Sequence, residues 1–508
     1  MPGRSKYSEM TDVSTPVATG GIRRPSLIDS LAPVALLILF LATSYWLYGE
    51  KAAQGPNQVA LGFCALIASG IAWKNGVAWS GLRQATVDGV AVGLSAIFIL
   101  LAVGALIGTW ALSGTIVTMV YYGLQILSPH YFYASTALIC AGVAVGIGSS
   151  WTVAGTIGIG LIGVATNMGL SPAITAGAVI SGAYFGDKTS PLSDTVNLAT
   201  ASAGSDLFEH IRETLWTSVP ALCLSVVGFA LLGRPGDFDA SAILSGLGQH
   251  FVITPWALSP LILVFGLAVL RVPPFVTIFA GALFGGVLAI VFNAHQVTAF
   301  AQDASLPAPL AMLKGVWSAM ANGYVTNTGQ PDLDRLLSRG GMVSMLNTIW
   351  LILTALAFGA VLEHAGMLNR LIEPVVGGVR STVGLIVAVV GTCTGVNVIA
   401  SDQYIAIVLP ARMFRVEFDR RGLRPVALSR AVGDSGSVTS PLIPWNSCGA
   451  YMAAALGVST LSYAGFAFFC LLNPLATVAI ALFGFRLHRA EQTNPVGRWR
   501  SNDKTPGD

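Results

Sequence analysis

Charge is what this sequence has least of. Only 10% of its 508 residues are Asp, Glu, Lys or Arg, whereas a soluble domain carries about 25%. In contrast, 54% of the residues are hydrophobic and the mean hydropathy is +0.71. So few charged side chains cannot cover the surface of a soluble protein of this length. The composition therefore excludes a soluble globular protein and predicts a membrane protein.

Two further classes of function are excluded by what is missing. The net charge is only +3, and no block of Arg and Lys alternates with aromatic residues, so the chain offers no nucleic-acid surface. The six cysteines lie in or beside apolar stretches, without a CxxC pair or a histidine spacing that suits zinc. We interpret them as buried apolar side chains and expect no cofactor.

The apolar stretches predict an all-α polytopic membrane protein. A transmembrane helix needs about 20 apolar residues, and we expect about 11–14 such helices together with one or two broken or re-entrant segments. The predicted organisation is a cytoplasmic N-terminal tail (1–30), N-terminal spans (31–86), a first repeat (87–232), linking spans (255–293), a second repeat (334–485) and a cytoplasmic C-terminal tail (486–508).

Positive charge gathers at a few places, and these are expected to be cytoplasmic. Lys74 and Arg83 form one such place, and both tails are basic. The largest group is predicted to form one loop and consists of Arg412, Arg415, Arg420, Arg421, Arg424 and Arg430. By contrast, no Asp, Glu, Lys or Arg occurs in the 98 residues from 89 to 186.

An internal repeat relates the two halves of the chain. Gly186-Asp187 is followed by Ser190-Pro191-Leu192, and Gly433-Asp434 is followed by Ser440-Pro441-Leu442. Upstream of these motifs lie two further polar, glycine-rich interruptions, at 148–152 and 391–395. The stretch between the interruptions is uncharged in the first half and holds the six arginines in the second. Opposite charge bias at equivalent points predicts an inverted-topology repeat; the alternative is a chance match of two Ser-Pro turns.

The first motif has the composition of a cation site. An ionisable side chain inside an apolar run is costly and is a functional candidate. Pro191 is expected to break its helix and to free backbone carbonyls. With these carbonyls, the predicted Na⁺ ligands form an oxygen-rich shell: Asp187, Thr189, Ser190, Ser193 and Asp194. Alternatively, Asp187 and Lys188 neutralise one another and the hydroxyl groups only pack helices.

The second motif offers a counterpart with one carboxylate and no lysine. Asp434, Ser440 and Asn446 are its predicted ion ligands, and Pro441 and Pro444 are its predicted helix breaks. A third polar stretch lies upstream of this motif. The candidates for a substrate contact or a charge partner are Lys188, Asn397 and Asp402.

Four of these stretches resemble the NhaC family of sodium/proton antiporters: residues 181–195, 401–410, 433–436 and 440–450. The resemblance implies a secondary carrier of the bacterial inner membrane, with inverted repeats, re-entrant segments and an elevator-like motion. The family also includes exchangers that couple malate and lactate to sodium and protons, and carriers of other organic substrates.

Three hypotheses for the function of this protein are compared. The leading hypothesis is exchange of Na⁺ for H⁺ by alternating access, with one buried carboxylate shared by both ions. The second is a Na⁺/H⁺-linked carrier of an organic acid or amino acid. The third is an intramembrane aspartyl protease, whose G-x-G-D motif is not matched because Tyr184 and Ala431 stand at the outer glycine positions. We therefore expect a transporter rather than an enzyme, with the lipid bilayer as its surroundings and a homodimer as a further possibility.

Overall fold

The computed structural model describes residues 23–233, 252–303, 305–325 and 340–484, together with Leu244, Leu247 and Ser338. The described residues fold into helices, and no β-strand occurs among them. This is the all-α class that the composition predicted. The C-terminal tail and residues 1–22 of the predicted N-terminal tail lie outside the described residues.

Seven of the described helices are long and apolar enough to cross a membrane. They are α1 (Leu27–Tyr48), α2 (Pro56–Lys74), α4 (Leu94–Leu112), α11 (Leu207–Leu231), α14 (Pro274–Phe300), α17 (Leu346–His364) with the short turn before it, and α19 (Thr382–Ala400). Shorter apolar helices are α5 (Thr115–Ile126), α6 (Phe132–Ile147), α13 (Ser259–Val269), α22 (Ser447–Leu456) and α24 (Phe468–Leu482). The chain is a multi-pass membrane protein, and the number of complete crossings stays a prediction.

The remaining helices are shorter or more polar. They are α3 (Trp79–Val92), α7 (Ser150–Val153), α8 (Ile159–Asn167), α9 (Pro172–Thr189), α10 (Asp194–Ala203), α15 (Ala308–Asn322), α18 (Met367–Gly378), α20 (Gln403–Arg420), α21 (Pro425–Val432) and α23 (Thr460–Ala464). The sequence reading did not anticipate α15, because its apolar residues occupy only part of its circumference and Lys314 lies at its centre.

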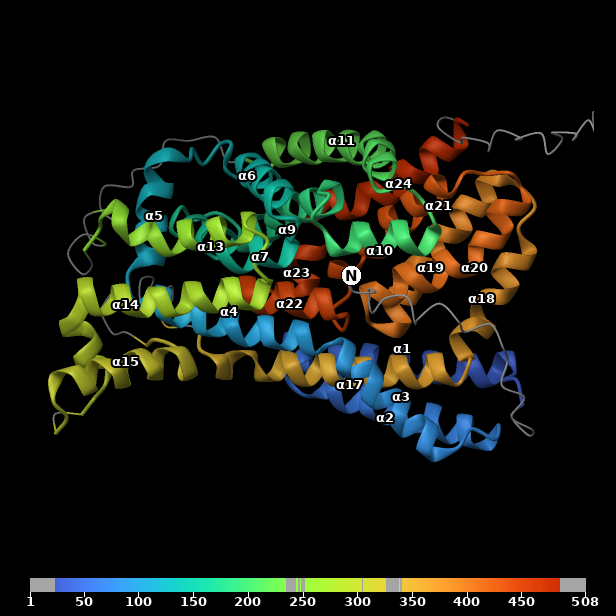
Figure 1. The fold of residues 1–508 in the computed structure, drawn as a ribbon, viewed down its shortest axis with the longest axis horizontal. Coiled ribbons are helices and arrows are strands. Elements are labelled where there is room, and N and C mark those ends of the chain that lie inside the picture. The colour runs from blue at the N-terminus through green and yellow to red at the C-terminus, as the bar shows by residue number, and fades with distance from the viewer. Residues whose placement is uncertain are drawn as a thin grey trace, which may run out of the picture.

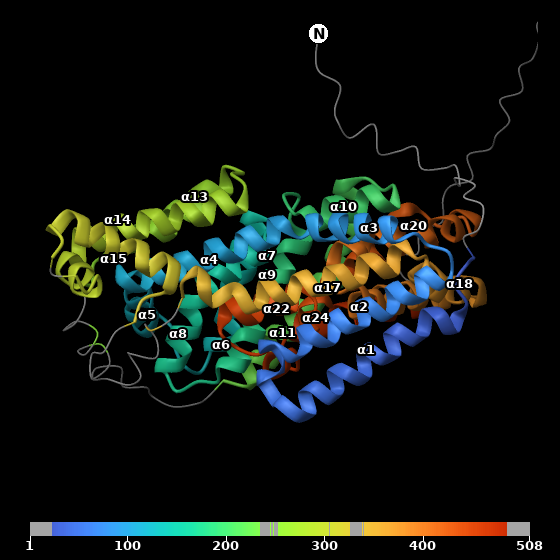
Figure 2. The ribbon, with the colours of Figure 1, turned by 90° about the horizontal axis from the view of Figure 1, so that it is seen from below.

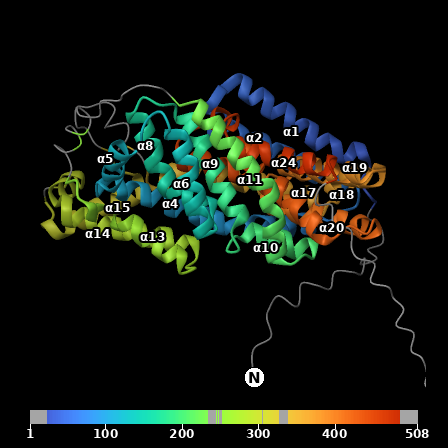
Figure 3. The ribbon, with the colours of Figure 1, turned by 90° about the horizontal axis from the view of Figure 1, so that it is seen from above.

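The helices form two groups that differ in how regular they are. Helices α1, α2, α3 and α17 pack together, and α4 packs with α14 and α15 (Figures 1 and 2). The interrupted helices lie beside them, and α11 packs across α6 and α9 (Figure 3). Long helices thus flank a region in which helices begin and end inside the protein.

The α3–α4 segment and α17 run antiparallel in close contact. A Cβ atom added to Gly89 would lie 2.4 Å from the Cβ of Ala360, and one added to Gly104 would lie 2.5 Å from the carbonyl oxygen of Gly341. Residue numbers therefore rise along one helix where they fall along the other. Glycine is needed at both points because any side chain would push the two backbones apart.

This antiparallel pair also shows the repeat. Helices α4 and α17 each have 19 residues, and their first residues are 252 positions apart. Each is followed by a glycine in the left-handed region, Gly114 or Gly366, and then by a helix of 12 residues, α5 or α18. Equal elements in the same order and with opposite direction are what an inverted repeat requires. The predicted limits 87–232 and 334–485 enclose these elements.

Two details of the predicted repeat are wrong. The stretch 391–395 does not interrupt a helix, because α19 continues through it and ends at Ala400. The break comes at Ser401 and Asp402 instead. Glycine and threonine are tolerated within a helix that neighbouring helices cover, so these residue types did not mark the true break.

The six arginines do not form one loop. Arg412, Arg415 and Arg420 lie on α20, and only Arg421 and Arg424 lie in the turn before α21. Arg430 is buried on α21, with Nη1 3.5 Å from the Glu213 carboxylate. Because this carboxylate compensates its charge, Arg430 is an internal residue and not part of a cytoplasmic cluster.

Candidate ion-binding site

Each repeat contains two helix breaks, and the breaks correspond in pairs. In the first repeat Ser149 and Ser193 cap the N-termini of α7 and α10. In the second repeat Asp402 and Asn446 cap α20 and α22, and each lies 253 positions after its counterpart. The residues before the first break of each repeat, Gly148 and Ser401, both have positive φ angles, 75° and 59°. The breaks are therefore equivalent in geometry and different in chemistry.

Asp187 joins the two breaks of the first repeat. It lies in the last turn of α9 and is 8% exposed. Its carboxylate accepts hydrogen bonds from the hydroxyl and the backbone N–H of Ser150, at 2.6 and 3.3 Å, and from the Ser193 hydroxyl at 2.5 Å. These contacts place one carboxylate and two hydroxyl oxygens within one small volume, as a hard cation requires.

The corresponding part of the second repeat is built from amides and hydroxyls. The Asn397 side chain donates to the Gly436 carbonyl at 2.6 Å and to the Thr439 hydroxyl at 3.0 Å. Asn446 in turn donates to the Asn397 side-chain oxygen at 3.1 Å. Ser440 bonds to the Gln403 side chain at 3.5 Å. At the position equivalent to Asp187, 253 residues later, the second repeat therefore presents the neutral hydroxyl of Ser440.

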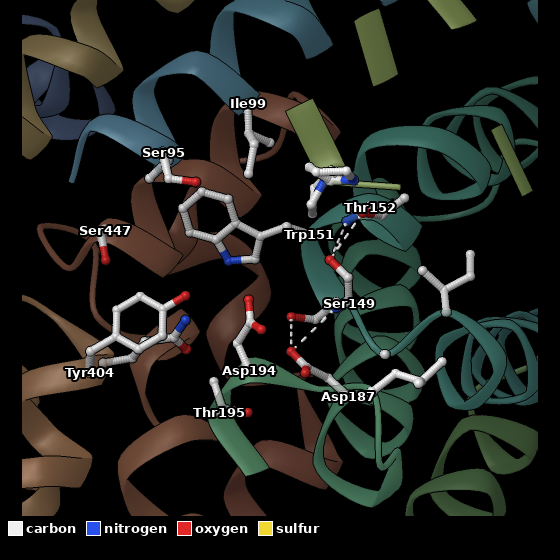
Figure 4. Close-up of a pocket in the computed structure, with 18 of the residues that line it drawn as sticks. Ser95, Ile99, Ser149, Trp151, Thr152, Asp187, Asp194, Thr195, Tyr404 and Ser447 are labelled. Carbon is white, nitrogen blue, oxygen red and sulfur yellow. Dashed lines mark hydrogen bonds between the residues drawn. The ribbon is translucent and has the colours of Figure 1, made fainter. Parts of the chain in front are cut away.

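A cavity of about 600 Å³ lies between these two halves. Equivalent residues from both repeats line it, among them Trp151 with Tyr404 and Asp194 with Ser447, each pair separated by 253 positions. Asp187, Asp402 and Arg271 also line this cavity. Figure 4 shows Asp194, Trp151 and Tyr404 around the same space as Asp187. The cavity thus connects the predicted first-repeat site with the second repeat.

Asp434 does not occupy the place equivalent to Asp187. It lies six residues before Ser440, whereas Asp187 lies three residues before Ser190, so it is about one helical turn further from its break. Its carboxylate forms an ion pair with Lys188, and both side chains are buried. The structure thus separates Asp434 from the other predicted ligands and gives Lys188 a partner other than Asp187.

Three further side chains complete the surroundings of Asp434. Thr214 donates to its carboxylate at 3.2 Å, Asn473 donates at 3.1 Å, and Thr477 also donates to it. With Lys188, four donors from three other helices surround one carboxylate. A carboxylate so fully occupied is part of the protein interior rather than of the cavity lining.

The sequence reading missed this buried polar network. Near the Lys188–Asp434 pair, His210 bonds to the Ser429 hydroxyl at 3.0 Å, and Glu213 approaches Arg430. Helix α11 begins at Leu207, so its first two turns precede the continuous apolar part of this helix. Counting the first two turns of α11 as part of the span would have identified His210 and Glu213 as ionisable residues in an apolar environment.

The other predicted residues have these positions. Asp402 caps α20 by accepting from the backbone N–H groups of Tyr404 and Ile405, at 2.8 and 3.1 Å. Thr189 donates to the carbonyl of Phe185 at 2.8 Å, so its hydroxyl serves the helix end. The remaining members occupy the breaks themselves: Ser190 and Pro191 between α9 and α10, and Pro441 and Pro444 before α22.

Long apolar helices, equivalent helix breaks in two antiparallel repeats and a polar cavity between them define a membrane transporter of the inverted-repeat class. A family model described as the Na⁺/H⁺ antiporter family matches residues 182–485. The chain belongs to this family, and the resemblance to NhaC is confirmed.

Three relatives show the range of the family. The Na⁺/H⁺ antiporter NhaC of Alkalihalophilus pseudofirmus is 38% identical over 84% of this chain and 89% of its own length. The arginine/ornithine antiporter ArcD of Halobacterium salinarum is 34% identical over 92% of this chain and 94% of its own. The malate-2H⁺/Na⁺-lactate antiporter of Bacillus subtilis is 34% identical over 88% of this chain and 92% of its own length.

Proposed function

We propose that this protein exchanges Na⁺ for H⁺ across the bacterial inner membrane, and that both ions use the Asp187 carboxylate. The observation that carries the proposal is the contact of this carboxylate with Ser150 and Ser193 at the edge of the cavity. The names of the NhaC relatives support the choice of ions. The proposed role is transport, not enzymatic chemistry.

Exchange follows from competition for one carboxylate. Ionised Asp187 binds Na⁺ together with the hydroxyl oxygens of Ser150 and Ser193, and protonated Asp187 binds none. Release of Na⁺ on one side and uptake of a proton there leave a neutral carboxyl group, which returns its proton on the other side. The inverted repeats supply the two access states, because exchanging the conformations of the two repeats moves the opening from one side to the other. An elevator-like motion of the interrupted helices against the unbroken ones fits this scheme.

Na⁺ affinity is expected to depend on pH. Well below the pH at which the site titrates, each unit of acidification should weaken apparent Na⁺ affinity about tenfold, because one proton must leave for each Na⁺ that binds. Above that pH the affinity should reach a plateau. Calorimetric titration of the purified protein with NaCl at several pH values, with no organic acid or amine present, measures this. A pH-independent affinity would contradict a shared carboxylate.

We further propose that both termini are cytoplasmic. The turn between α20 and α21 then lies on the cytoplasmic side of the membrane, and the turn between α8 and α9 lies on the opposite side. Arg420, Arg421 and Arg424 at the former turn, against an uncharged latter turn, support this orientation.

Cysteine labelling of intact cells tests the orientation. In a background without the six native cysteines, Arg420→Cys is expected to react with a membrane-impermeant maleimide only after the cells are opened. Pro172→Cys, at the exposed start of α9, is expected to react from outside. Labelling of both positions from the same side would refute the inverted arrangement.

A second candidate function is a Na⁺/H⁺-linked carrier of an organic acid or an amino acid. The volume of the cavity favours it, since ligand sites for small organic molecules measure about 300–1,000 Å³ and this cavity measures about 600 Å³. The names of two relatives include such substrates. Uptake of labelled organic compounds into proteoliposomes under a Na⁺ gradient separates this candidate from simple exchange.

A further inference from the structure

The cavity is lined by more negatively charged than positively charged side chains. Among the described residues its lining contains three carboxylates, Asp187, Asp194 and Asp402, and one guanidinium group, Arg271. Lys188 takes no part, because it is paired with Asp434 outside this lining. An organic dianion would meet mainly carboxylates here, whereas a cationic group would be attracted by them.

Asp194 is the carboxylate available to a ligand. Asp187 is engaged by Ser150 and Ser193, and Asp402 caps α20. Asp194 is exposed to the cavity, and no hydrogen bond or ion pair joins it to any of the described residues. An exposed carboxylate that no protein group engages is available to a cationic group of a ligand.

Two aromatic side chains lie beside this carboxylate. Trp151 and Tyr404 occupy equivalent positions in the two repeats and both line the cavity; Figure 4 shows Asp194 next to both. Aromatic rings that flank a carboxylate suit an alkylammonium group, which gains from cation–π and apolar contacts. A site for Na⁺ alone does not explain these aromatic side chains, because Na⁺ prefers oxygen ligands.

Arg271 gives the cavity one site of opposite charge. It lies in the turn between α13 and α14 and has a φ of 62°. A non-glycine residue in this region is strained and persists where its surroundings require it. Its guanidinium group is suited to a carboxylate. The cavity therefore offers one group for an ammonium and one for a carboxylate.

We propose that the cavity binds an amino acid, with its ammonium group at Asp194 between Trp151 and Tyr404, and its carboxylate at Arg271. This inference rests on the proposed transport function and names the class of its organic substrate. It favours an amino acid over malate or lactate, since neither of these carries an ammonium group for Asp194.

Three compounds of similar length test the proposal. Lysine carries both kinds of group, cadaverine carries only ammonium groups, and glutarate carries only carboxylates. Each is titrated into the purified full-length protein, and binding is measured by calorimetry. Lysine is expected to bind most tightly, cadaverine more weakly, and glutarate least. Tighter binding of glutarate than of lysine would overturn the proposal.

Matched variants assign the two ends of the ligand. Asp194→Asn is expected to weaken the binding of lysine and cadaverine at least tenfold, since each loses a charge-assisted contact. Arg271→Gln is expected to weaken lysine about tenfold and to leave cadaverine unchanged. Asp88→Asn and Arg83→Gln make the same chemical changes at exposed positions of α3 outside the cavity and should change neither. Equal effects of Arg271→Gln on lysine and cadaverine would refute the assignment of the carboxylate.

Ion exchange is measured in parallel on the unaltered protein, so that the two proposals fail separately. Na⁺/H⁺ exchange without any lysine binding would overturn this inference and leave the proposed function standing. Lysine binding and transport without Na⁺/H⁺ exchange would overturn the proposed function and leave the amino-acid site standing.

Discussion

Replacing Asp187 by Asn is expected to reduce Na⁺/H⁺ exchange to below about 1% of the wild-type rate. The reason is that a side-chain amide carries no negative charge for Na⁺ and does not take up and release a proton as a carboxylate does. The variant should fold, since the asparagine oxygen can still accept from one of the two serine hydroxyls, Ser150 or Ser193, and its NH₂ group can donate to the oxygen of the other. The measurement is dequenching of a pH-sensitive dye in proteoliposomes after a Na⁺ pulse.

The matched control is Asp88→Asn. Asp88 is exposed on α3, where it accepts a hydrogen bond from Gln84 at 2.9 Å, and it does not line the cavity. This variant is expected to exchange ions at the wild-type rate. Near-normal exchange by a monodisperse Asp187→Asn protein would show that the shared carboxylate is elsewhere.

Breaking the pair between Lys188 and Asp434 is expected to give the largest loss of stability. Lys188→Met leaves the Asp434 carboxylate buried without its cation, and Asp434→Asn leaves Lys188 without its anion. Removing one partner of a buried pair costs ~3–5 kcal/mol. Both single variants should therefore unfold at markedly lower temperature in detergent, as followed by tryptophan fluorescence.

The double variant Lys188→Met/Asp434→Asn provides the decisive comparison. It removes both charges and keeps a side-chain oxygen for the Thr214, Asn473 and Thr477 donors, so it should recover most of the lost stability. Arg370→Met serves as the control, because Arg370 and Glu373 form an exposed pair at 3.3 Å and such a pair contributes at most about 1 kcal/mol. A Lys188→Met protein as stable as the wild type would contradict the importance of this pair.

Proline accompanies two of the helix breaks. Pro191 and Pro441 follow the ends of interrupted helices, as expected for residues that remove a backbone N–H and clash with the preceding turn. The break at Ser401 has no proline. Ser401 has a left-handed backbone conformation, and Asp402 caps the next helix. In the sequence, only a serine followed by an aspartate could have indicated this break.

The pairing of Lys188 with Asp434 and of Arg430 with Glu213 depended on the fold. Consecutive residues of a helix point about 100° apart, so Asp187 and Lys188 face different neighbours although they are adjacent in sequence. Asp187 meets the breaks of its own repeat, and Lys188 meets Asp434 of the other repeat. For the same reason Arg430 pairs with Glu213 across a separation of 217 positions, which no local pattern specifies.

The sequence by itself determined that this chain lies in the membrane, that two related halves with interrupted helices form it, and that Asp187 stands among oxygen-bearing side chains. These features depend on composition and on the local effects of proline and hydroxyl residues, which act within a few positions. The tertiary structure alone decided that Asp194, Trp151, Tyr404 and Arg271 share one cavity with Asp187, and that Asp434 is withdrawn from it by Lys188. Such groupings arise from the packing of helices that are distant in the chain, and the energy of a buried charge is set by the neighbours that this packing supplies.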